Sequence, residues 1–492
     1  MNGFQNQKPH LVALPFPSLG HSIPFLDMAR LLASHGLTVS YVTTAANAPR
    51  LQHHVMEAAT NGLDIRLAVI PTPAVEGLDG RESAELLPRS DHGLIFQLAE
   101  KLQEPFDLWI EQQFQGETET EAPVCIVHDV FMGWARESAE KYKISCIEFN
   151  ASGAFAVSLL YSVSRTLLQK EARKQDEDSV VFGLDLPHSH KFRQHEIADD
   201  FFDGGPLNSR IEFILRRLLS IGKSSGMLIN TFKELEPTYV EHLRNLTGKP
   251  VWAIGPLLPP GYFSGATKGS SRGKMADVGE DELVQWLDSQ SPRSTVYVSF
   301  GSETFLSEQQ TNALARGLEA SGQPFIWAIK LSPTTESEFS DRATKYLPRE
   351  FLERTKGRGL IIWGWAPQLL ILSHSSVAAF MSHCGWNSTL ESITLGVPII
   401  AWPMYGDQFF NVRLLAELGL GIQFCEHRPG LPNEEKVGAA VIQVICGEEG
   451  REMRTCAEKL REMARKAVED GGSSKANVQA FASHMQSLRR VT

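Results

Sequence analysis

Short apolar runs that alternate with polar turns and helical patterns constrain the fold of this chain more than any other feature. Residues 11–16 are apolar, residues 17–24 are rich in turn residues, residues 25–34 have a helical pattern, and residues 37–43 are β-branched and apolar. This order predicts a strand–helix–strand unit. Such units build parallel sheets with helices on both faces, so we predict an α/β fold.

The same alternation recurs in both halves of the chain. Further apolar runs predict strands at residues 65–70, 124–127, 146–149, 227–230, 295–300, 325–329, 360–363, 377–381 and 397–401. Helical patterns are found at residues 307–321, 387–395 and 409–418. A chain of 492 residues is longer than one ordinary core organises, so we predict two domains.

A change in composition separates the two halves. Residues 256–279 are rich in Pro, Gly, Ser and Lys, which is typical of a linker. We expect an N-terminal domain at residues 1–255, a linker at 256–280, a C-terminal domain at 281–470, and a terminal helix at 471–492 that packs back on the first domain. Ligands of open α/β sheets bind at the carboxyl ends of the strands, so we expect the site in a cleft between the domains.

Charge and composition narrow the partners and the compartment. Asp and Glu outnumber Lys and Arg by 58 to 47, which argues against nucleic acid or an anionic membrane as a partner. No apolar run approaches the roughly 20 residues that span a bilayer. The N-terminus lacks the apolar stretch of a signal peptide, and the six cysteines form no C-x-x-C pair and are expected to be free thiols. We therefore expect a cytoplasmic monomer without an integral membrane segment.

The stretch Trp365–Gln408 places polar groups after successive apolar strands. Residues 382–388 read S-H-C-G-W-N-S and precede a helix, whose N-terminus can offer unpaired N–H groups to an anion such as a diphosphate. Glu391, one turn into that helix, can accept the hydroxyls of a ribose. The tryptophan that opens the stretch can stack on a base, and Asp407 with Gln408 can bridge the vicinal hydroxyls of a sugar.

Each of these features has an ordinary structural explanation when it is taken alone. Asn387 or Ser388 could simply cap the helix, and Asp407 could cap the next one. Glu391 could be a surface carboxylate, and Trp365 could pack in the core. Together, their order and spacing favour a site for a nucleotide sugar.

The stretch closely resembles the signature box of the plant family 1 UDP-glycosyltransferases. The resemblance rests on the opening Trp365, H-C-G-W-N-S in the middle, Glu391, a G-V-P turn and the closing D-Q pair. It extends to the length of the chain and to a G-H-x-x-P turn near the N-terminus. It implies the GT-B fold, in which two Rossmann-like domains with parallel sheets face a cleft, and sugar transfer from a UDP-sugar without a metal or a separate cofactor.

The resemblance also implies roles for individual residues. UDP would be held by stacking on Trp365, by Ala366 and Gln368 beside the base and ribose, by Glu391 at the ribose hydroxyls, and at the diphosphate by His383, Asn387, Ser388 and Ser302. The sugar would contact Asp407, Gln408 and the backbone of Trp386. A closing glutamine favours glucose as the transferred sugar.

His21 supplies the other half of the expected chemistry. It follows the first strand and should face the cleft, where a neutral imidazole can remove a proton from an acceptor hydroxyl. Asp129, which follows the strand at 124–127, is the candidate partner for its second ring nitrogen. We expect inverting transfer of glucose to a hydroxyl of a small lipophilic acceptor, such as a flavonoid, phenolic or terpenoid, which gives a β-glucoside.

Other functions stay open at this point. The same fold could attack through an aromatic carbon, or could extend an existing sugar chain, as the turn Gly301-Ser302-Glu303 suggests by resemblance. A non-catalytic nucleotide-sugar-binding protein is a further alternative, although His21 and Asp129 argue against it. The D-x-D spacing of residues 176–178 lies in a polar charge run, which favours a solvated surface over a metal site.

The acceptor pocket has no sequence signature. We expect it to be built by the N-terminal domain, with loops at residues 77–94 and 184–202. Asn150 follows the strand at 146–149 and is a further candidate for a sugar contact.

Overall fold

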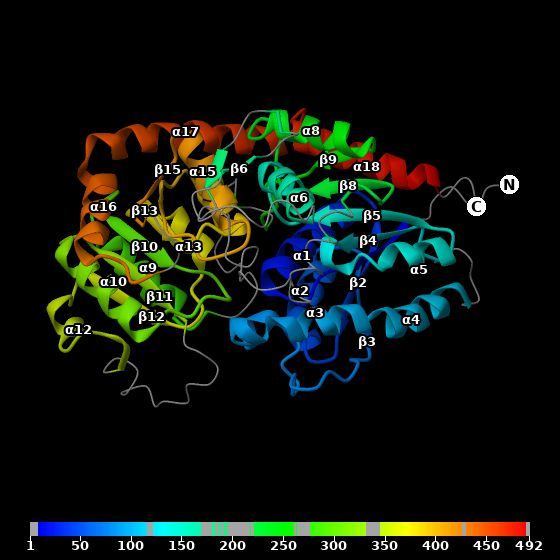
Figure 1. Cartoon of the computed structure of the whole chain (residues 1–492), viewed down its shortest axis with the longest axis horizontal. Helices are drawn as coiled ribbons and strands as arrows, with labels where there is room; N and C mark the ends of the chain where they lie inside the picture. The colour runs from blue at the N-terminus through cyan, green and yellow to red at the C-terminus, as the bar shows by residue number, and fades with distance from the viewer. Residues whose placement is uncertain are drawn as a thin grey trace.

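The computed structural model contains two β-sheets of parallel strands, one in each half of the chain (Figure 1). The structure describes residues 8–115, 122–168, 180–182, 186–187, 191–193, 217, 221–259, 262, 276–330, 345–425 and 430–488. The α/β fold with two parallel sheets, which the sequence predicts, is confirmed.

The first sheet has seven strands in the order β3-β2-β1-β4-β5-β8-β9. They are β1 (His10–Leu14), β2 (Thr38–Thr44), β3 (Ile65–Ile70), β4 (Cys125–Asp129), β5 (Ser145–Asn150), β8 (Gly226–Ile229) and β9 (Val251–Ala253). The strand order reverses between β1 and β4, which pair in parallel. Such a reversal opens a crevice at the carboxyl ends of the two strands, because the connections leave in opposite directions.

The second sheet has six strands in the order β12-β11-β10-β13-β14-β15 and reverses between β10 and β13. Its strands are β10 (Thr295–Ser299), β11 (Phe325–Ile329), β12 (Gly359–Trp363), β13 (Val377–Ser382), β14 (Ile399–Ala401) and β15 (Gly421–Gln423). The short strands β9 and β15 were not predicted. A small antiparallel pair, β6 (Val180–Phe182) and β7 (Lys191–Arg193), lies outside both sheets.

Helices cover the faces of both sheets. Those of the first half are α1 (Leu19–Ser34), α2 (Ala48–Thr60), α3 (His92–Lys101), α4 (Gln103–Gln115), α5 (Ala135–Lys141), α6 (Ala154–Leu168) and α8 (Pro237–Thr247), with the 3-10 turns η1 (Ala84–Leu86), η2 (Arg89–Asp91) and η4 (Val130–Met132). Those of the second half are α9 (Glu280–Asp288), α10 (Glu308–Ala320), α12 (Phe351–Arg354), α13 (Gln368–Ser373), α14 (Trp386–Leu395), α15 (Gln408–Glu417), α16 (Glu434–Cys446), α17 (Glu448–Val468) and α18 (Ser473–Leu488).

Helix α1 begins six residues earlier than the sequence predicts. The pattern of residues 17–24 favours a turn, yet the helix starts at Leu19, after an extended Ser18, and includes Pro24. Local preferences of Gly, Ser and Pro are worth about 1–3 kcal/mol and tertiary contacts can override them. As a result His21 lies in the first turn of a helix rather than in a loop.

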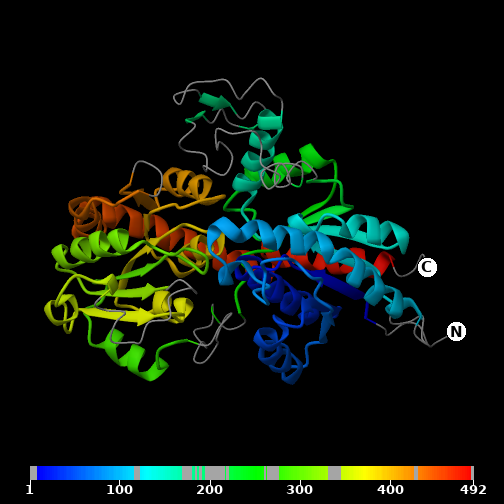
Figure 2. The same ribbon diagram turned by 60° about the horizontal axis from the view of Figure 1, so that its bottom comes forward.

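The last two helices join the halves of the molecule. Figures 1 and 2 show α17 leaving the second half and α18 lying along the first sheet. Phe481 of α18 packs edge-on against Trp252 of β9, with ring centroids 5.2 Å apart, and Asn477 Nδ2 donates to the Ala253 carbonyl at 3.0 Å. Helices α6 and α15 also share one apolar cluster, in which Phe155 and Phe410 are fully buried. The domain boundaries at 255, 280 and 470 stay a proposal.

Two further expectations concern the cysteines and the membrane. The structure describes all six cysteines as free thiols; Cys125, Cys146 and Cys384 are buried, whereas Cys446 is exposed. Within the described residues, no helix combines the length and the hydrophobicity that a bilayer crossing requires.

Candidate active site

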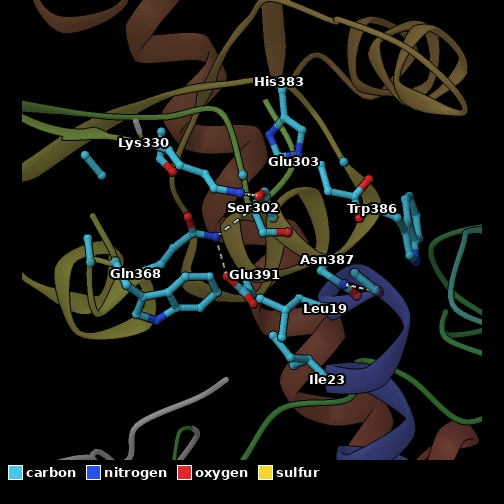
Figure 3. Close-up of a pocket in the computed structure, with 18 of the residues that line it drawn as sticks. Leu19, Ile23, Ser302, Glu303, Lys330, Gln368, His383, Trp386, Asn387 and Glu391 are labelled. Atoms are coloured by element: carbon cyan, nitrogen blue, oxygen red, sulfur yellow. Dashed lines mark hydrogen bonds between the residues drawn. The ribbon is translucent and has the colours of Figure 1, made fainter. Parts of the chain in front are cut away.

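A cavity of about 360 Å³ lies where the carboxyl ends of the two sheets meet. It is lined by the first turn of α1, by the turn after β10, and by the starts of α13, α14 and α15 (Figure 3). Both topological reversals open toward it, which is the usual ligand position in open α/β sheets. Twelve of the residues assigned from the sequence line this cavity, namely His21, Ser302, Trp365, Ala366, Gln368, His383, Trp386, Asn387, Ser388, Glu391, Asp407 and Gln408.

His21 and Asp129 form a close pair at the reversal between β1 and β4. His21 Nδ1 lies 2.7 Å from Asp129 Oδ2, and Asp129 is 1% exposed. An ionised carboxylate only accepts hydrogen bonds, so Nδ1 carries the proton and Nε2 is left as an acceptor. The second oxygen, Asp129 Oδ1, accepts from the Phe131 backbone N–H at 3.0 Å, which fixes the orientation of the carboxylate.

The environment of His21 makes its imidazole more basic than usual. Burial by itself lowers the pKa of His21, but the charge and hydrogen bond of Asp129, followed by the charges of Glu303 and Asp407, more than offset this, and the pKa is raised above its usual value. The imidazole can therefore hold a proton that it removes from a hydroxyl.

Three phenylalanines surround one side of the His21 ring. Phe16 meets the imidazole edge-on, with centroids 5.4 Å apart, and Phe131 lies 5.6 Å away. Phe96 of α3 packs against both phenylalanines, at 5.2 Å from Phe16 and 5.3 Å from Phe131. Phe96 and Phe131 are only partly buried. We call Phe16, Phe96 and Phe131 the aromatic wall; it offers an apolar surface beside the proton acceptor.

The turn between β13 and α14 presents a bare helix N-terminus to the cavity. The N-cap residue is Gly385, which has no side chain to bond the first N–H groups of α14. Cys384, just before it, adopts the left-handed region at φ 63°, and its carbonyl accepts from Asn411 Nδ2 at 2.9 Å. Neither Asn387 nor Ser388 is the N-cap, so simple capping does not explain them. An uncapped helix start of this kind suits a diphosphate.

His383 in this turn is a neutral side chain. Burial lowers its pKa to about 4, and its Nδ1 is buried without a hydrogen-bond partner. The ring lies against Gly301, whose φ of +78° only glycine adopts readily, and a Cβ there would stand 2.5 Å from His383 Nε2. A neutral ring beside the helix start can donate one hydrogen bond to a phosphate oxygen.

Hydrogen bonds organise the part of the cavity in which we expect the base and the ribose. Gln368 Nε2 donates to Glu391 Oε2 at 2.6 Å and to Ser388 Oγ at 3.0 Å, which places these three residues side by side (Figure 3). Trp365 is only partly buried, and its backbone N–H donates to Asp277 Oδ2 at 2.6 Å. This partial exposure fits a Trp365 ring that faces the cavity better than a ring that is packed in the core.

The part of the cavity in which we expect the sugar combines residues of both halves of the molecule. Asp407 stands at the N-cap position of α15 but makes no capping bond; its Oδ2 accepts instead from Ser152 Oγ at 2.9 Å. Burial raises the pKa of Asp407, and the hydrogen bond from Ser152 partly offsets this. Gln408 Oε1 accepts from the backbone N–H groups of Met404 and Tyr405, at 2.8 and 3.0 Å, so its amide nitrogen is the group available to a sugar.

Trp386 joins the two halves through its side chain. Its Nε1 donates to the Asn230 carbonyl at 2.6 Å, and its ring fills the space above Gly153, where a Cβ would come within 2.7 Å of it. The backbone of Trp386 stays at the start of α14, in the place where the resemblance expects a sugar contact.

Asn150 does not reach the cavity. It is 5% exposed, and its Nδ2 donates to Glu148 Oε1 at 2.7 Å. Both residues belong to β5, where side chains two positions apart share a face, and this face is turned away from the cavity. Ser152, two residues further along the chain, takes the place that we expected for Asn150.

Polar cavity residues that the sequence reasoning did not assign to the site include Ser152, Asp277, Glu303 and Lys330. Ser18 Oγ donates to Glu303 Oε1 at 2.5 Å across the cleft, and Lys330 Nζ donates to the carbonyls of Ser302 and Glu85. Lys330 directly follows β11, and Ser152 and Glu303 lie in the turns after β5 and β10, so the position after a strand could have marked these three. Asp277 lies in an irregular segment before α9 and carries no such signal.

One group of described residues has the spacing of a metal site, and it lies outside the cavity. His53, His54 and Glu57 of α2 hold their ligand atoms within 4.8 Å of one another. Arg30 occupies this place, because its NH2 group lies 3.0 Å from Glu57 Oε2 and 3.5 Å from His54 Nδ1. The positive charge of this guanidinium repels a metal cation, so it disfavours metal binding at this place. Residues 176–178 lie outside the described residues.

Of the two loops expected at the acceptor pocket, the first is described throughout and the second only in part. Residues 77–94 include η1 and η2, and the Arg89 guanidinium lies 3.8 Å from the ring centroid of Tyr405 in the other half of the molecule. Within residues 184–202, the structure describes only 186–187 and 191–193.

Comparison with known sequences identifies both halves of the chain. Residues 255–450 match the family described as UDP-glucuronosyl and UDP-glucosyl transferase, and residues 8–259 match the family described as glycosyltransferase, N-terminal domain. A scopoletin glucosyltransferase of Nicotiana tabacum is 38% identical over 94% of this chain and 95% of its own length. A UDP-glucose flavonoid 3-O-glucosyltransferase of Fragaria ananassa is 36% identical over 98% of this chain and 97% of its own.

Comparison with solved structures gives the same picture. The crystal structure of UGT73P12 of Glycyrrhiza uralensis, complexed with glycyrrhetinic acid 3-O-monoglucuronide, superimposes with a TM-score of 0.84. The two sequences are 30% identical, and the match covers 98% of this chain and 96% of that one.

Proposed function

Because the chain belongs to the plant family 1 UDP-glycosyltransferases, we propose that it transfers glucose from UDP-glucose to a hydroxyl of a small lipophilic acceptor with inversion. The GT-B fold and the activity of a UDP-glycosyltransferase, which the sequence predicts, are confirmed by this membership. Glucose as the sugar, the class of acceptor, the roles of single residues, independence of metal, a monomeric state and a cytoplasmic location belong to the proposal.

The observation that carries the mechanism is the His21–Asp129 pair at the rim of the donor cavity. His21 Nε2 takes the proton of the acceptor hydroxyl, while Asp129 holds Nδ1–H and stabilises the imidazolium that forms. The oxygen attacks the anomeric carbon from the face opposite UDP, a C–O bond forms as the bond to the diphosphate breaks, and a β-glucoside results. Negative charge grows on the leaving UDP.

The C-terminal half stabilises that leaving group. The start of α14 directs its N–H groups and the positive end of the helix dipole to the diphosphate, and Asn387, Ser388 and neutral His383 add donors. Trp365 stacks on the uracil and Glu391 accepts from the ribose hydroxyls. Gln408, whose carbonyl oxygen is committed to the backbone, donates from its amide nitrogen to a glucose hydroxyl, and Asp407 accepts beside it.

The aromatic wall supports an aromatic or otherwise lipophilic acceptor. Replacing Phe96 by Ala should raise the KM for such an acceptor about fivefold and leave the KM for UDP-glucose within about twofold, because a lost aromatic contact costs about 1 kcal/mol. Phe114→Ala is the matched control, since Phe114 of α4 stacks on Tyr142 away from the cavity. Steady-state kinetics with both substrates varied gives the answer; an equal rise in both KM values would contradict a role in the acceptor site.

An acceptor that already carries a sugar is the second candidate. Glu303 supports it, because its carboxylate lines the cavity close to His21 and can accept from sugar hydroxyls. The related structure from Glycyrrhiza uralensis, which holds a monoglucuronide, also supports it.

Mass spectrometry of the products from a mixed acceptor library tests the function and separates the two candidates. The library pairs each flavonoid, phenolic and terpenoid aglycone with its monoglucoside, and UDP-glucose is the donor. We expect the aglycones to gain one hexose, and we expect acid to release this hexose again. Hexose gain confined to the glycosides would favour chain extension, and acid-stable products would indicate attack through carbon. Tight UDP-glucose binding without any product would refute the proposal in favour of a binding protein.

A further inference from the structure

The first turn of α1 has a carbonyl group whose usual helical partner is missing. In an α-helix the carbonyl of one residue accepts from the N–H four positions later. Four positions after Gly20 stands Pro24, which has no N–H. The Gly20 carbonyl accepts instead from Asn387 Nδ2, at 2.8 Å, from the other half of the molecule (Figure 3).

The amide of Asn387 can serve two acceptors at once. Its Nδ2 carries two hydrogens, and the bond to Gly20 uses one of them. A carbonyl only accepts, so this bond also fixes which end of the amide faces α1; Asn387 Oδ1 is buried and has no partner. Asn387 is the second residue of α14 and lines the cavity, so the second hydrogen can go to a phosphate oxygen.

Gly20 is joined by a peptide bond to His21. The carbonyl that Asn387 holds belongs to the amide group between these two residues, while the side chain of His21 is held on its other side by Asp129. A side chain that is held at one hydrogen bond is free to adopt other rotamers, whereas one held at two hydrogen bonds is restricted to a single rotamer. An anion that accepts the second hydrogen therefore holds the Asn387 side chain in the rotamer that reaches the backbone that carries His21.

We propose that Asn387 is an interdomain latch, a positioning residue that couples occupation of the diphosphate site to the placement of His21. This proposal rests on the proposed function, which makes His21 the base. It depends on Pro24, because this proline leaves the Gly20 carbonyl without a partner inside α1. Without a proline at this position the Gly20 carbonyl would be satisfied inside α1, and the two halves would lose this connection.

Pro24→Ala tests the latch without changing a group that lines the cavity. The new N–H competes for the Gly20 carbonyl, so kcat should fall about five- to tenfold, the effect of one weakened hydrogen bond, while the KM for UDP-glucose and the Kd for UDP stay within about twofold. Asn387→Ala should lower kcat and also raise both constants. Pro49→Ala, the same change in the first turn of α2, is the matched control and should leave kcat unchanged.

A double-mutant cycle decides whether the two residues act together. We expect kcat of the doubly substituted protein to equal that of Asn387→Ala alone, because both changes remove the same connection. Losses that multiply, or a Pro24→Ala protein with the kcat of the wild type, would overturn the latch. Calorimetric binding of UDP shows that each variant is folded.

Hydrogen exchange with UDP alone provides a readout that needs no turnover. Saturating UDP should slow amide exchange in the first turns of α1 in the wild type, less in Pro24→Ala and not at all in Asn387→Ala. Equal protection in all three proteins would refute the latch. If the wild type transfers no sugar, the proposed function fails, whereas this experiment still tests the connection between α14 and α1.

Discussion

His21→Ala should lower kcat by about three orders of magnitude, because general base catalysis contributes roughly 10²–10⁴ and, among the described residues, no other imidazole lines the cavity on the side of α1. The Kd for UDP should stay within about twofold of the wild-type value, since the UDP contacts that we propose come from the other half of the molecule. The rate of product formation with the best acceptor gives kcat, and calorimetry with UDP gives the Kd.

The matched control for this change is His35→Ala. His35 is the C-cap of the same helix, and its ring interacts with the Leu31 carbonyl and not with the cavity. It should retain the turnover of the wild type. Turnover close to wild type in His21→Ala would refute His21 as the base, and loss of UDP binding would show that the substitution disturbs the fold of the cleft.

Asp129→Asn should lower the maximal rate about a hundredfold or more, because the substitution changes which ring nitrogen of His21 carries the proton. Asp129 Oδ1 accepts from the Phe131 N–H, so an amide at this place keeps its oxygen there and turns its NH2 group to His21 Nδ1. Nδ1 must then accept, and the proton moves to Nε2. The atom that should take the proton of the acceptor is thereby blocked.

The same substitution should shift the pH dependence in a defined direction. The carboxylate of Asp129 helps to raise the pKa of His21 above its usual value of 6.5, against the lowering effect of burial. The base is active when it is neutral, so kcat/KM falls as the pH drops through that raised pKa. Without the negative charge the imidazolium is less stable, its pKa falls, and the acid limb should move to lower pH. Rates of the wild type and the variant, measured from pH 5 to 9 in buffers of matched ionic strength, test this shift, because the usual His pKa of roughly 6.5 lies within that range.

Asp288→Asn is the control for both effects. Asp288 and His374 form a similar pair on the outside of the second domain, with 3.1 Å between Oδ1 and Nε2. Its loss should change neither the maximal rate nor the acid limb. A variant of Asp129 whose acid limb moves to higher pH would contradict the assignment of that carboxylate.

The sequence locates the cavity-lining residues of the two halves of the molecule to different extents. The donor half lies in one continuous stretch, Trp365–Gln408, in which strand, turn and helix follow one another at fixed spacing, so its members could be found by position alone. The strands Ile65–Ile70 and Phe325–Ile329 were predicted to the residue for a similar reason. The first run is bounded by Asp64 and Pro71 and the second by Pro324 and Lys330, so each ends against a proline on one side and a charged residue on the other.

Features that depend on contacts between distant segments could not be found in this way. The aromatic wall brings together residues 16, 96 and 131, and Ser152 meets Asp407 across the cleft. Asn150 was assigned to the sugar because it follows a strand, but the face on which it lies is set by the packing of β5 against its neighbours. The position of a residue after a strand shows at which end of the sheet the residue lies, but it does not show in which direction the side chain points.

The sequence by itself determined the two parallel sheets, the sites after their central strands and the residue types that a nucleotide sugar requires, because periodicity and spacing are local properties of the chain. Only the tertiary structure decided which of those groups meet. In the tertiary structure α1 begins at Leu19, and His21 Nδ1 lies 2.7 Å from Asp129 Oδ2. The Gly20 carbonyl, which has no helical partner because of Pro24, accepts from Asn387. The physical reason is that a hydrogen bond between segments far apart in the chain depends on how two sheets pack, and no local pattern records it.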